Sequence, residues 1–278
     1  MSASRRFVAS YPVAVFIVGA FTLQALIVLS QHFQIHNHGL SGVRLFMPAI
    51  CAIGVSFAVA GGAGVRTLLR SLAVWRVAPK FYAFALLYPA AVALFALGAL
   101  RLTGQVESIH FDFGEAAGLD FLWLSVRISL VEEVAWVGFL LERLSQRWRL
   151  FGACVAAGAA WGVWYIPLVL AEIQVAPGLP ILPLILNFMT IAAICGWLYL
   201  RTKSAFVVFV MQLTTNYTSQ IIPVLPLRGG VRQYIAFVVM KALFALALYW
   251  FWGPRPLFGA VPKGSSSLDL KHASLLPS

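Results

Sequence analysis

The sequence predicts an all-α protein, a polytopic transmembrane helical bundle of about eight spans. Hydrophobic residues make up 61% of its 278 residues and charged residues only 10%, whereas soluble domains average about 45–50% and about 25%. The mean hydropathy is +0.89. The apolar residues form long continuous runs, unlike the alternating strands of a membrane β-barrel. This composition excludes a soluble enzyme, a disordered chain and a disulfide scaffold.

Each predicted span is a run of about 20 predominantly apolar residues, the length that crosses a bilayer. The spans cover residues 11–30, 46–64, 81–100, 120–141, 152–171, 181–200, 205–224 and 234–252. Between the second and third spans, Val65, Leu68 and Leu72 recur at helical spacing. The segment 65–80 is therefore compatible with an amphipathic helix in the membrane interface, and equally with an ordinary charged loop.

Lysine and arginine are distributed unevenly between the loops. With the N-terminus inside, 14 of the 20 Lys and Arg residues fall in cytoplasmic segments and 4 in external ones. Because positive residues are enriched on the cytoplasmic side of membrane proteins, we expect both termini to be cytoplasmic. The net charge of +11 is then attributed to loops that face anionic membrane lipid, with no nucleic acid as partner.

One transmembrane domain, residues 1–254, accounts for all the spans. Arg5 and Arg6 precede the first apolar run without an A-x-A cleavage site, so that run is expected to be a retained span and not a signal peptide. Residues 255–278 are rich in Pro, Ser and Gly. They cannot bury a core and are expected to form a disordered cytoplasmic tail.

Two adjacent glutamates, Glu132 and Glu133, lie near the middle of the fourth predicted span. An ionisable residue at that depth costs at least ~2.5 kcal/mol and generally faces a polar cavity or a partner. Successive helical residues point about 100° apart, so one glutamate can face a cavity while the other meets a neighbouring helix. The pair marks a candidate functional site, and a purely structural hydrogen-bonded pair is the alternative.

Three other polar residues lie at a comparable depth: Tyr165 in the fifth span, and Gln212 and Asn216 one turn apart in the seventh. Counted from the expected cytoplasmic ends at about 1.5 Å per residue, this set lies roughly 10–20 Å deep. We therefore expect these residues and the glutamate pair to line one cavity in the cytoplasmic half of the membrane. Gly158 and Gly162 form a GxxxG motif, which predicts close helix packing.

The residues around these positions resemble three motifs of the CAAX-processing and bacteriocin-processing (CPBP) membrane proteases, the type II CAAX prenyl endopeptidases. Residues 132–141 (EEVAWVGFLL) resemble the first motif, Glu-Glu-x-x-x-Arg-Gly. Residues 161–167 (WGVWYIP) are similar to the second, Trp-x-x-Trp-His-x-Pro, and residues 196–216 to the third, which ends in His-x-x-x-Asn. The resemblance covers residues 65–225, with the motifs in the same order and at similar spacing.

The resemblance implies that Glu132 activates water and that Asn216 stabilises the oxyanion. The family's arginine is Val137 here, and its two histidines are Tyr165 and Gln212. Both replacements can donate hydrogen bonds, but neither titrates near neutral pH as histidine does. The implied protein is an intramembrane endopeptidase for membrane-anchored or prenylated peptides or proteins, in a bacterial inner membrane, with weakened or lost activity.

No cofactor or metal is expected, because Tyr165 and Gln212 are not usual metal ligands. His32, His36 and His38 could bind a metal together, but the sequence places them in an external loop and they are expected to be solvated. Two other functions stay open. One is a catalytically inactive binding or immunity scaffold; the other is a proton-coupled transporter, which the lack of an internal repeat disfavours.

Overall fold

The computed structural model describes residues 3–33, 43–173, 175–254 and 257, and that part of the chain is helical without a strand. Helices occupy all eight ranges in which spans were predicted. The long helices are α2 (Pro12–His32), α4 (Met47–Arg70), α5 (Pro79–Leu102), α6 (Leu119–Glu132), α8 (Leu150–Leu170), α9 (Ile181–Thr202), α10 (Ala205–Ile221) and α12 (Val231–Trp252). The short ones are α1 (Ala3–Ser10), η1 (Ser71–Ala73), η2 (Glu115–Ala117), η3 (Glu133–Leu141), α7 (Glu142–Ser145) and α11 (Pro226–Gly229).

Six of these helices are long and apolar enough to cross a membrane, namely α2, α4, α5, α8, α9 and α12. The protein is therefore an integral membrane protein. Helix α10 has 17 residues, and α6 changes into a π-helix after 14 residues, so neither reaches about 20 residues alone. That α6 with η3, and α10, also cross the membrane stays a prediction.

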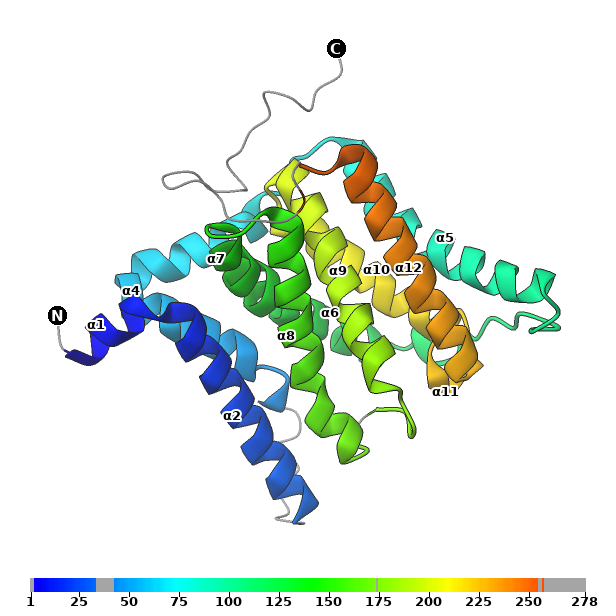
Figure 1. The fold of residues 1–278 in the computed structure, drawn as a ribbon, viewed down its shortest axis with the longest axis horizontal. Helices are drawn as coiled ribbons and strands as arrows, with labels where there is room; N and C mark the ends of the chain where they lie inside the picture. The colour runs from blue at the N-terminus through cyan, green and yellow to red at the C-terminus, as the bar shows by residue number, and fades with distance from the viewer. Residues whose placement is uncertain (1–2, 34–42, 174, 255–256, 258–278) are drawn as a thin grey trace.

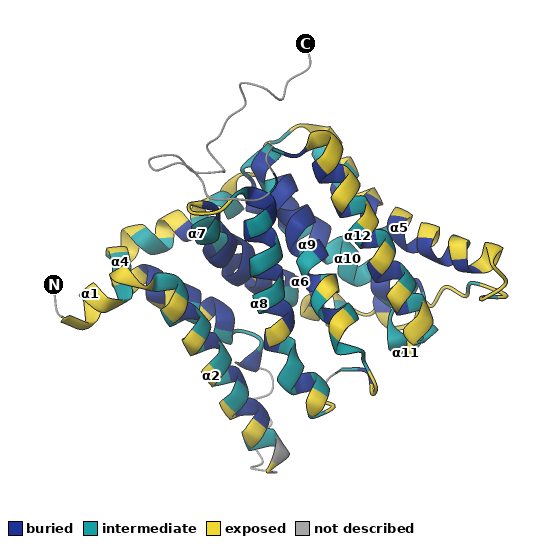
Figure 2. Cartoon of the chain, viewed as in Figure 1, coloured by how far each residue is buried: buried dark blue, intermediate teal, exposed yellow. Residues whose placement is uncertain are grey.

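Helices α8 and α9 form the centre of the bundle, with α2 beside α8 and α12 beside α9 (Figure 1). Figure 2 shows burial concentrated in this centre, while α1, α2 and α5 expose more of their surface. The GxxxG prediction is confirmed at the α8–α9 contact. A Cβ on Gly158 would lie 2.4 Å from the Met189 Cα atom, and one on Gly162 would lie 2.8 Å from the Ile185 Cα atom.

Helix α4 bends near its middle, at Ala60 and Gly61, where Gly61 has a φ of 61°. Glycine carries no Cβ, so it adopts this left-handed conformation at little cost. Beyond the bend the chain stays helical through Ala73, with Leu68 buried. The predicted amphipathic helix is therefore present up to that point. Residues 74–78 are not helical, because Pro79 disfavours the α conformation in the residue before it.

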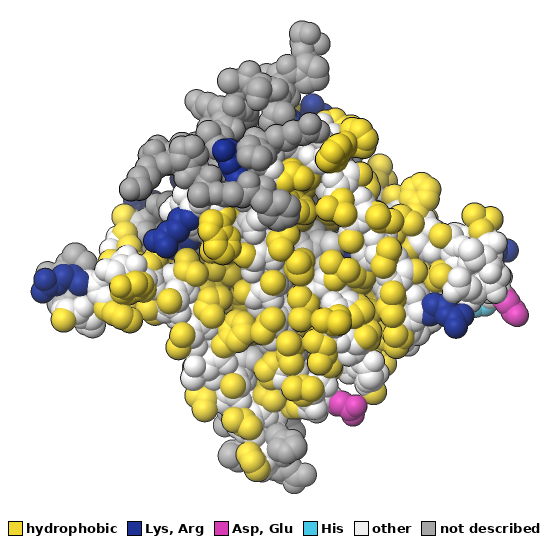
Figure 3. Space-filling model, viewed as in Figure 1, with side chains coloured by type: hydrophobic (Ala, Val, Ile, Leu, Met, Phe, Trp, Pro, Cys, Tyr) yellow, Lys and Arg dark blue, Asp and Glu magenta, His cyan; other side chains and the backbone are white. Residues whose placement is uncertain are grey.

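Hydrophobic side chains cover the middle of the face in Figure 3, and charged side chains lie toward its edges. Exposed apolar side chains include Leu87 and Phe95 on α5 and Leu246 and Trp250 on α12. Such a surface is unfavourable in water and suits contact with lipid chains. The predicted tail lies outside the described residues except for Leu257, as do His36 and His38 of the first loop.

A topology reporter fused after residue 278 should be active on the cytoplasmic side. The expectation rests on the loop arginines, including Arg143 and Arg147 near α7, which follow the positive-inside distribution. A paired fusion in the loop between α5 and α6, after Glu107, should read as external. A C-terminal reporter that is active only outside would contradict the predicted orientation.

Candidate active site

The helix that carries the acidic pair changes geometry between its two glutamates. Glu132 ends α6, and Glu133 begins the nine-residue π-helix η3. The predicted span over 120–141 is therefore helical throughout, but α-helical only as far as Glu132. In a π-helix the hydrogen bond runs from residue i to i+5, so Gly138 and not Val137 stacks over Glu133. Its Cβ position lies 3.3 Å from the Glu133 carbonyl oxygen.

Glu132 faces helix α8 and is 7% exposed. Its Oε1 atom accepts a hydrogen bond of 2.8 Å from the hydroxyl of Tyr165. The tyrosine ring is held from its other side by Phe188 of α9, with ring centroids 4.7 Å apart and planes inclined by 23°. Packing between α8 and α9 thus fixes the hydroxyl group that contacts the carboxylate.

Glu133 faces helix α10 and is fully buried. Its Oε2 atom accepts a 3.4 Å hydrogen bond from the amide of Gln212, and its Oε1 atom has no partner among the described residues. One turn away, the Asn216 amide donates a 3.1 Å hydrogen bond to the Ser129 hydroxyl. Two polar contacts therefore join α6 and η3 to α10.

Ser129 was missed by the sequence reasoning, although a signal for it existed. Ser125, Ser129 and Glu133 follow one another at intervals of four residues, a spacing that puts side chains on one helical face. Ser125 and Ser129 are both buried. The sequence therefore already indicated that the two serines lie on the same helical face as Glu133.

A cavity of about 250 Å³ brings the predicted residues together. Glu132, Tyr165, Gln212 and Asn216 line it, and Glu133 lies directly behind Gln212. The expected convergence on one cavity is therefore observed for four of the five residues, whereas Glu133 does not line the cavity. Its other lining residues come from α6, α8, α9, α10, α12 and the turn after α10; they include Phe121, Trp161, Asn187, Gln220, Leu225 and Lys241.

The cavity extends along the bundle away from α7. Its walls reach Phe121 at the start of α6, Gln220 at the end of α10 and Leu225 beyond it. These ends lie opposite the arginines near α7. The placement of the cavity in the cytoplasmic half of the membrane stays a prediction, because it depends on the predicted orientation of the bundle.

Arg44 is a further charged neighbour of the site that the sequence did not reveal. It precedes α4, is 6% exposed, and its guanidinium lies 5.8 Å from the centre of the Trp164 ring. Burial lowers the pKa of Arg44, and the neighbouring Tyr165 and Glu132 act in the opposite direction. Arg44 therefore supplies a positive charge near the acidic pair from the segment before α4. The arginine of the family motif would lie in η3, at the position of Val137.

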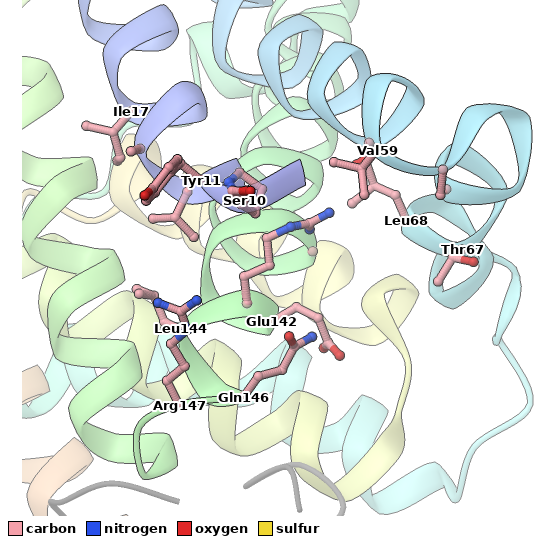
Figure 4. A pocket seen from close by; sticks show the side chains of 18 of the residues that line it. Ser10, Tyr11, Ile17, Val59, Thr67, Leu68, Glu142, Leu144, Gln146 and Arg147 are labelled. Carbon is pink, nitrogen blue, oxygen red and sulfur yellow. The ribbon is translucent and has the colours of Figure 1, made fainter. Parts of the chain in front are cut away.

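A second, larger cavity of about 1020 Å³ lies at the other end of the bundle. Figure 4 shows Tyr11 and Ile17 of the N-terminal segment across from Glu142 and Arg147. None of the five predicted site residues lines it. Its lining includes Gly138 of η3, whereas Glu132, the residue before η3, lines the smaller cavity.

The described residues contain no group of three or more His, Cys, Asp or Glu side chains that could hold a metal ion. The polar side chains that line the smaller cavity carry one carboxylate, two phenols, four amides, three aliphatic hydroxyls, one indole and one ammonium group. Such a set offers a proton acceptor and several hydrogen-bond donors. It is suited to acid–base chemistry on a bound polar group.

Comparisons with known proteins agree with this geometry. Residues 115–218 match the family model described as "Type II CAAX prenyl endopeptidase Rce1-like". The chain is also 31% identical over 87 residues to CAAX prenyl protease 2 of Methanococcus maripaludis. That alignment covers 30% of this chain and 32% of the relative, so the chain spans about a third of that protein's length. Residues 115–218, which contain all five predicted site residues, are therefore similar to the Rce1-like CAAX prenyl endopeptidases, and this similarity supports the resemblance to the CPBP family.

Proposed function

We propose that the protein is a CAAX-type intramembrane endopeptidase with weakened activity, in which Glu132 is the base. The observation that carries the proposal is the position of this carboxylate. It is buried, lines a cavity, and lies 2.8 Å from the Tyr165 hydroxyl. An intramembrane acid that faces a cavity is a functional site by default.

In the proposed reaction Glu132 accepts a proton from a water molecule as that water attacks the carbonyl carbon of a peptide bond. The carbon–nitrogen bond then breaks, and the leaving nitrogen takes the proton from Glu132. The Tyr165 hydroxyl, which lies beside the base, is the proposed donor to the developing oxyanion. Preorganised donors of this kind stabilise the charge that forms in the transition state.

Three features account for weakened activity. The Tyr165 hydroxyl occupies one oxygen of the base, where an attacking water would bind. The amides of Gln212 and Asn216 each donate one N–H to Glu133 and Ser129, so only the second N–H of each is available to an oxyanion. No residue that titrates near neutral pH replaces the two family histidines. These deficits act together and slow both water activation and departure of the amine.

Membrane-anchored or prenylated peptides or proteins are the substrates that fit this proposal. The apolar helices keep the protein within lipid, so a substrate meets the cavity most readily when it is anchored in the same membrane. We propose the bacterial inner membrane as its location. The name of the archaeal relative, a CAAX prenyl protease, supports the same class of substrate.

A second candidate function is a catalytically inactive binding scaffold. The paired contacts Glu133–Gln212 and Ser129–Asn216 favour it, because they join two helices through side chains on both sides. Hydrogen bonds between membrane helices commonly have this structural role. Binding of a prenylated peptide without hydrolysis would then be the activity.

A cleavage assay with Glu132→Gln separates the two functions. The purified protein should cleave a farnesylated CAAX peptide slowly, and Glu132→Gln should reduce that rate by about 10²-fold or more, as expected for loss of a positioned base. Glu107→Gln is the matched control, because Glu107 is exposed in a loop, and it should keep the wild-type rate. Wild-type hydrolysis at the background rate would contradict the proposal and favour the scaffold.

A further inference from the structure

Lys241 of α12 is a buried cation whose presence the proposed mechanism does not explain. Its side chain is 3% exposed, and it lines the same cavity as Glu132. Lysine in the middle of a membrane helix is costly and is generally retained for a function. The residue and Glu132 line that space from two different helices, α12 and α6.

The local contacts hold the ammonium group in place without neutralising it. Lys241 donates a hydrogen bond to the Oδ1 atom of Asn187 in α9. The ammonium nitrogen also lies 4.5 Å from the centre of the Phe237 ring, one turn earlier in α12. No carboxylate among the described residues forms an ion pair with it. Two of its three N–H donors are thus available to a ligand.

The other cation near this end of the cavity already has partners. Arg228 of α11 pairs with Asp112 and with Glu115, the latter at 2.7 Å. Glu115 also accepts a hydrogen bond from Gln220, which lines the cavity. A negatively charged group that enters the cavity therefore meets Lys241 as the unpaired positive charge among the described lining residues.

We propose that Lys241 binds the C-terminal carboxylate of a peptide whose nearby peptide bond faces Glu132. This inference rests on the proposed endopeptidase function, because it states which end of the peptide substrate binds in the cavity that contains Glu132. A buried ammonium group favours an anion as ligand, since the charge of an anion compensates its desolvation. The cavity of about 250 Å³ is also smaller than the roughly 300–1,000 Å³ of ordinary ligand pockets, which suits a chain end.

Asn187 and Phe188 link the proposed carboxylate site to the base. Asn187 contacts Lys241, and the adjacent Phe188 stacks on Tyr165, whose hydroxyl contacts Glu132. One short segment of α9 therefore sets the positions of both groups. Cleavage would release a short peptide that carries the carboxylate bound to Lys241.

The test measures binding, so it does not depend on catalysis. A fluorescein-labelled farnesyl-cysteine tetrapeptide with a free C-terminal carboxylate is compared with the same peptide ending in an amide, using protein in lipid nanodiscs. Wild-type protein should bind the acid about tenfold more tightly than the amide, the effect of one charge-assisted hydrogen bond. Equal affinity of wild-type protein for the two peptides would overturn the proposal without any variant.

Lys241→Met should abolish the preference for the acid while leaving the affinity for the amide unchanged. Lys80→Met, at an exposed lysine, is the matched control and should keep the preference. Glu132→Gln should keep it as well, so a protein that binds the acid but cleaves nothing would refute the endopeptidase function and not the carboxylate site. A preference that survives Lys241→Met in folded protein would overturn the site.

Discussion

Gly158→Ala is expected to destabilise the protein by about 3 kcal/mol, the upper end of the usual cost of overpacking a core. The Cβ atom of the new alanine would lie 2.4 Å from the Met189 Cα atom and 2.5 Å from the Phe188 carbonyl oxygen. Both are backbone atoms that cannot rotate away. Helices α8 and α9 must therefore separate to admit one methyl group.

The separation should also disturb the site. Phe188 packs on Trp161 and Tyr165, with ring centroids 4.8 Å and 4.7 Å away. Moving α9 shifts this ring, and with it the neighbouring Asn187 that contacts Lys241. A loss of peptide binding should therefore accompany the loss of stability, although Gly158 itself does not line the cavity.

The free energy of unfolding, measured by SDS titration of protein in mixed micelles, checks this prediction. Gly98→Ala is the matched control, because no atom lies within 4 Å of the Cβ position of Gly98 in α5. That variant should be as stable as wild type or slightly more stable, since alanine is the better helix former. Equal stability of the two variants would show that α8 and α9 do not pack as closely as described.

The helices and their closest contact could be predicted because the relevant signals are local. Runs of apolar residues fixed the eight helical ranges, and the Gly158–Gly162 spacing predicted the surface on which α8 meets α9. The meeting of Glu132 with Tyr165 was predicted from depth along two separate helices together with family motifs. The depth of a residue depends only on its position along its own helix, so it can be predicted before the packing of the helices is known.

Features that depend on the packing of distant segments were not predictable in the same way. The π-helix that begins at Glu133 changes which residue of the next turn lies over Glu133. The hydrophobic pattern of the sequence does not indicate this change. Arg44 reaches the site from a segment that precedes α4, far from every motif. Lys241 was visible as an intramembrane cation, but its partner Asn187 could be found only once α9 and α12 were placed together.

The double variant Tyr165→His, Gln212→His is expected to raise cleavage of a farnesylated CAAX peptide by about 10²-fold or more over wild type. Positioned proton transfer contributes about 10²–10⁴-fold to such reactions, and histidine is the side chain that exchanges protons near neutral pH. Histidine is also shorter than tyrosine. At position 165 it would leave the Glu132 oxygen that Tyr165 now occupies open to a water molecule.

The control must separate proton exchange from the extra space. Tyr165→Asn, Gln212→Asn provides shorter side chains that donate hydrogen bonds but do not titrate, so it should stay near the wild-type rate. Adding Glu132→Gln to the histidine variant should return cleavage to background, because the new histidines then have no base to assist. If the asparagine variant gains as much as the histidine variant, the block by Tyr165 and not the missing proton carrier limits the enzyme. If the folded histidine variant gains nothing, Glu132 is not poised for catalysis, and the cavity serves binding alone.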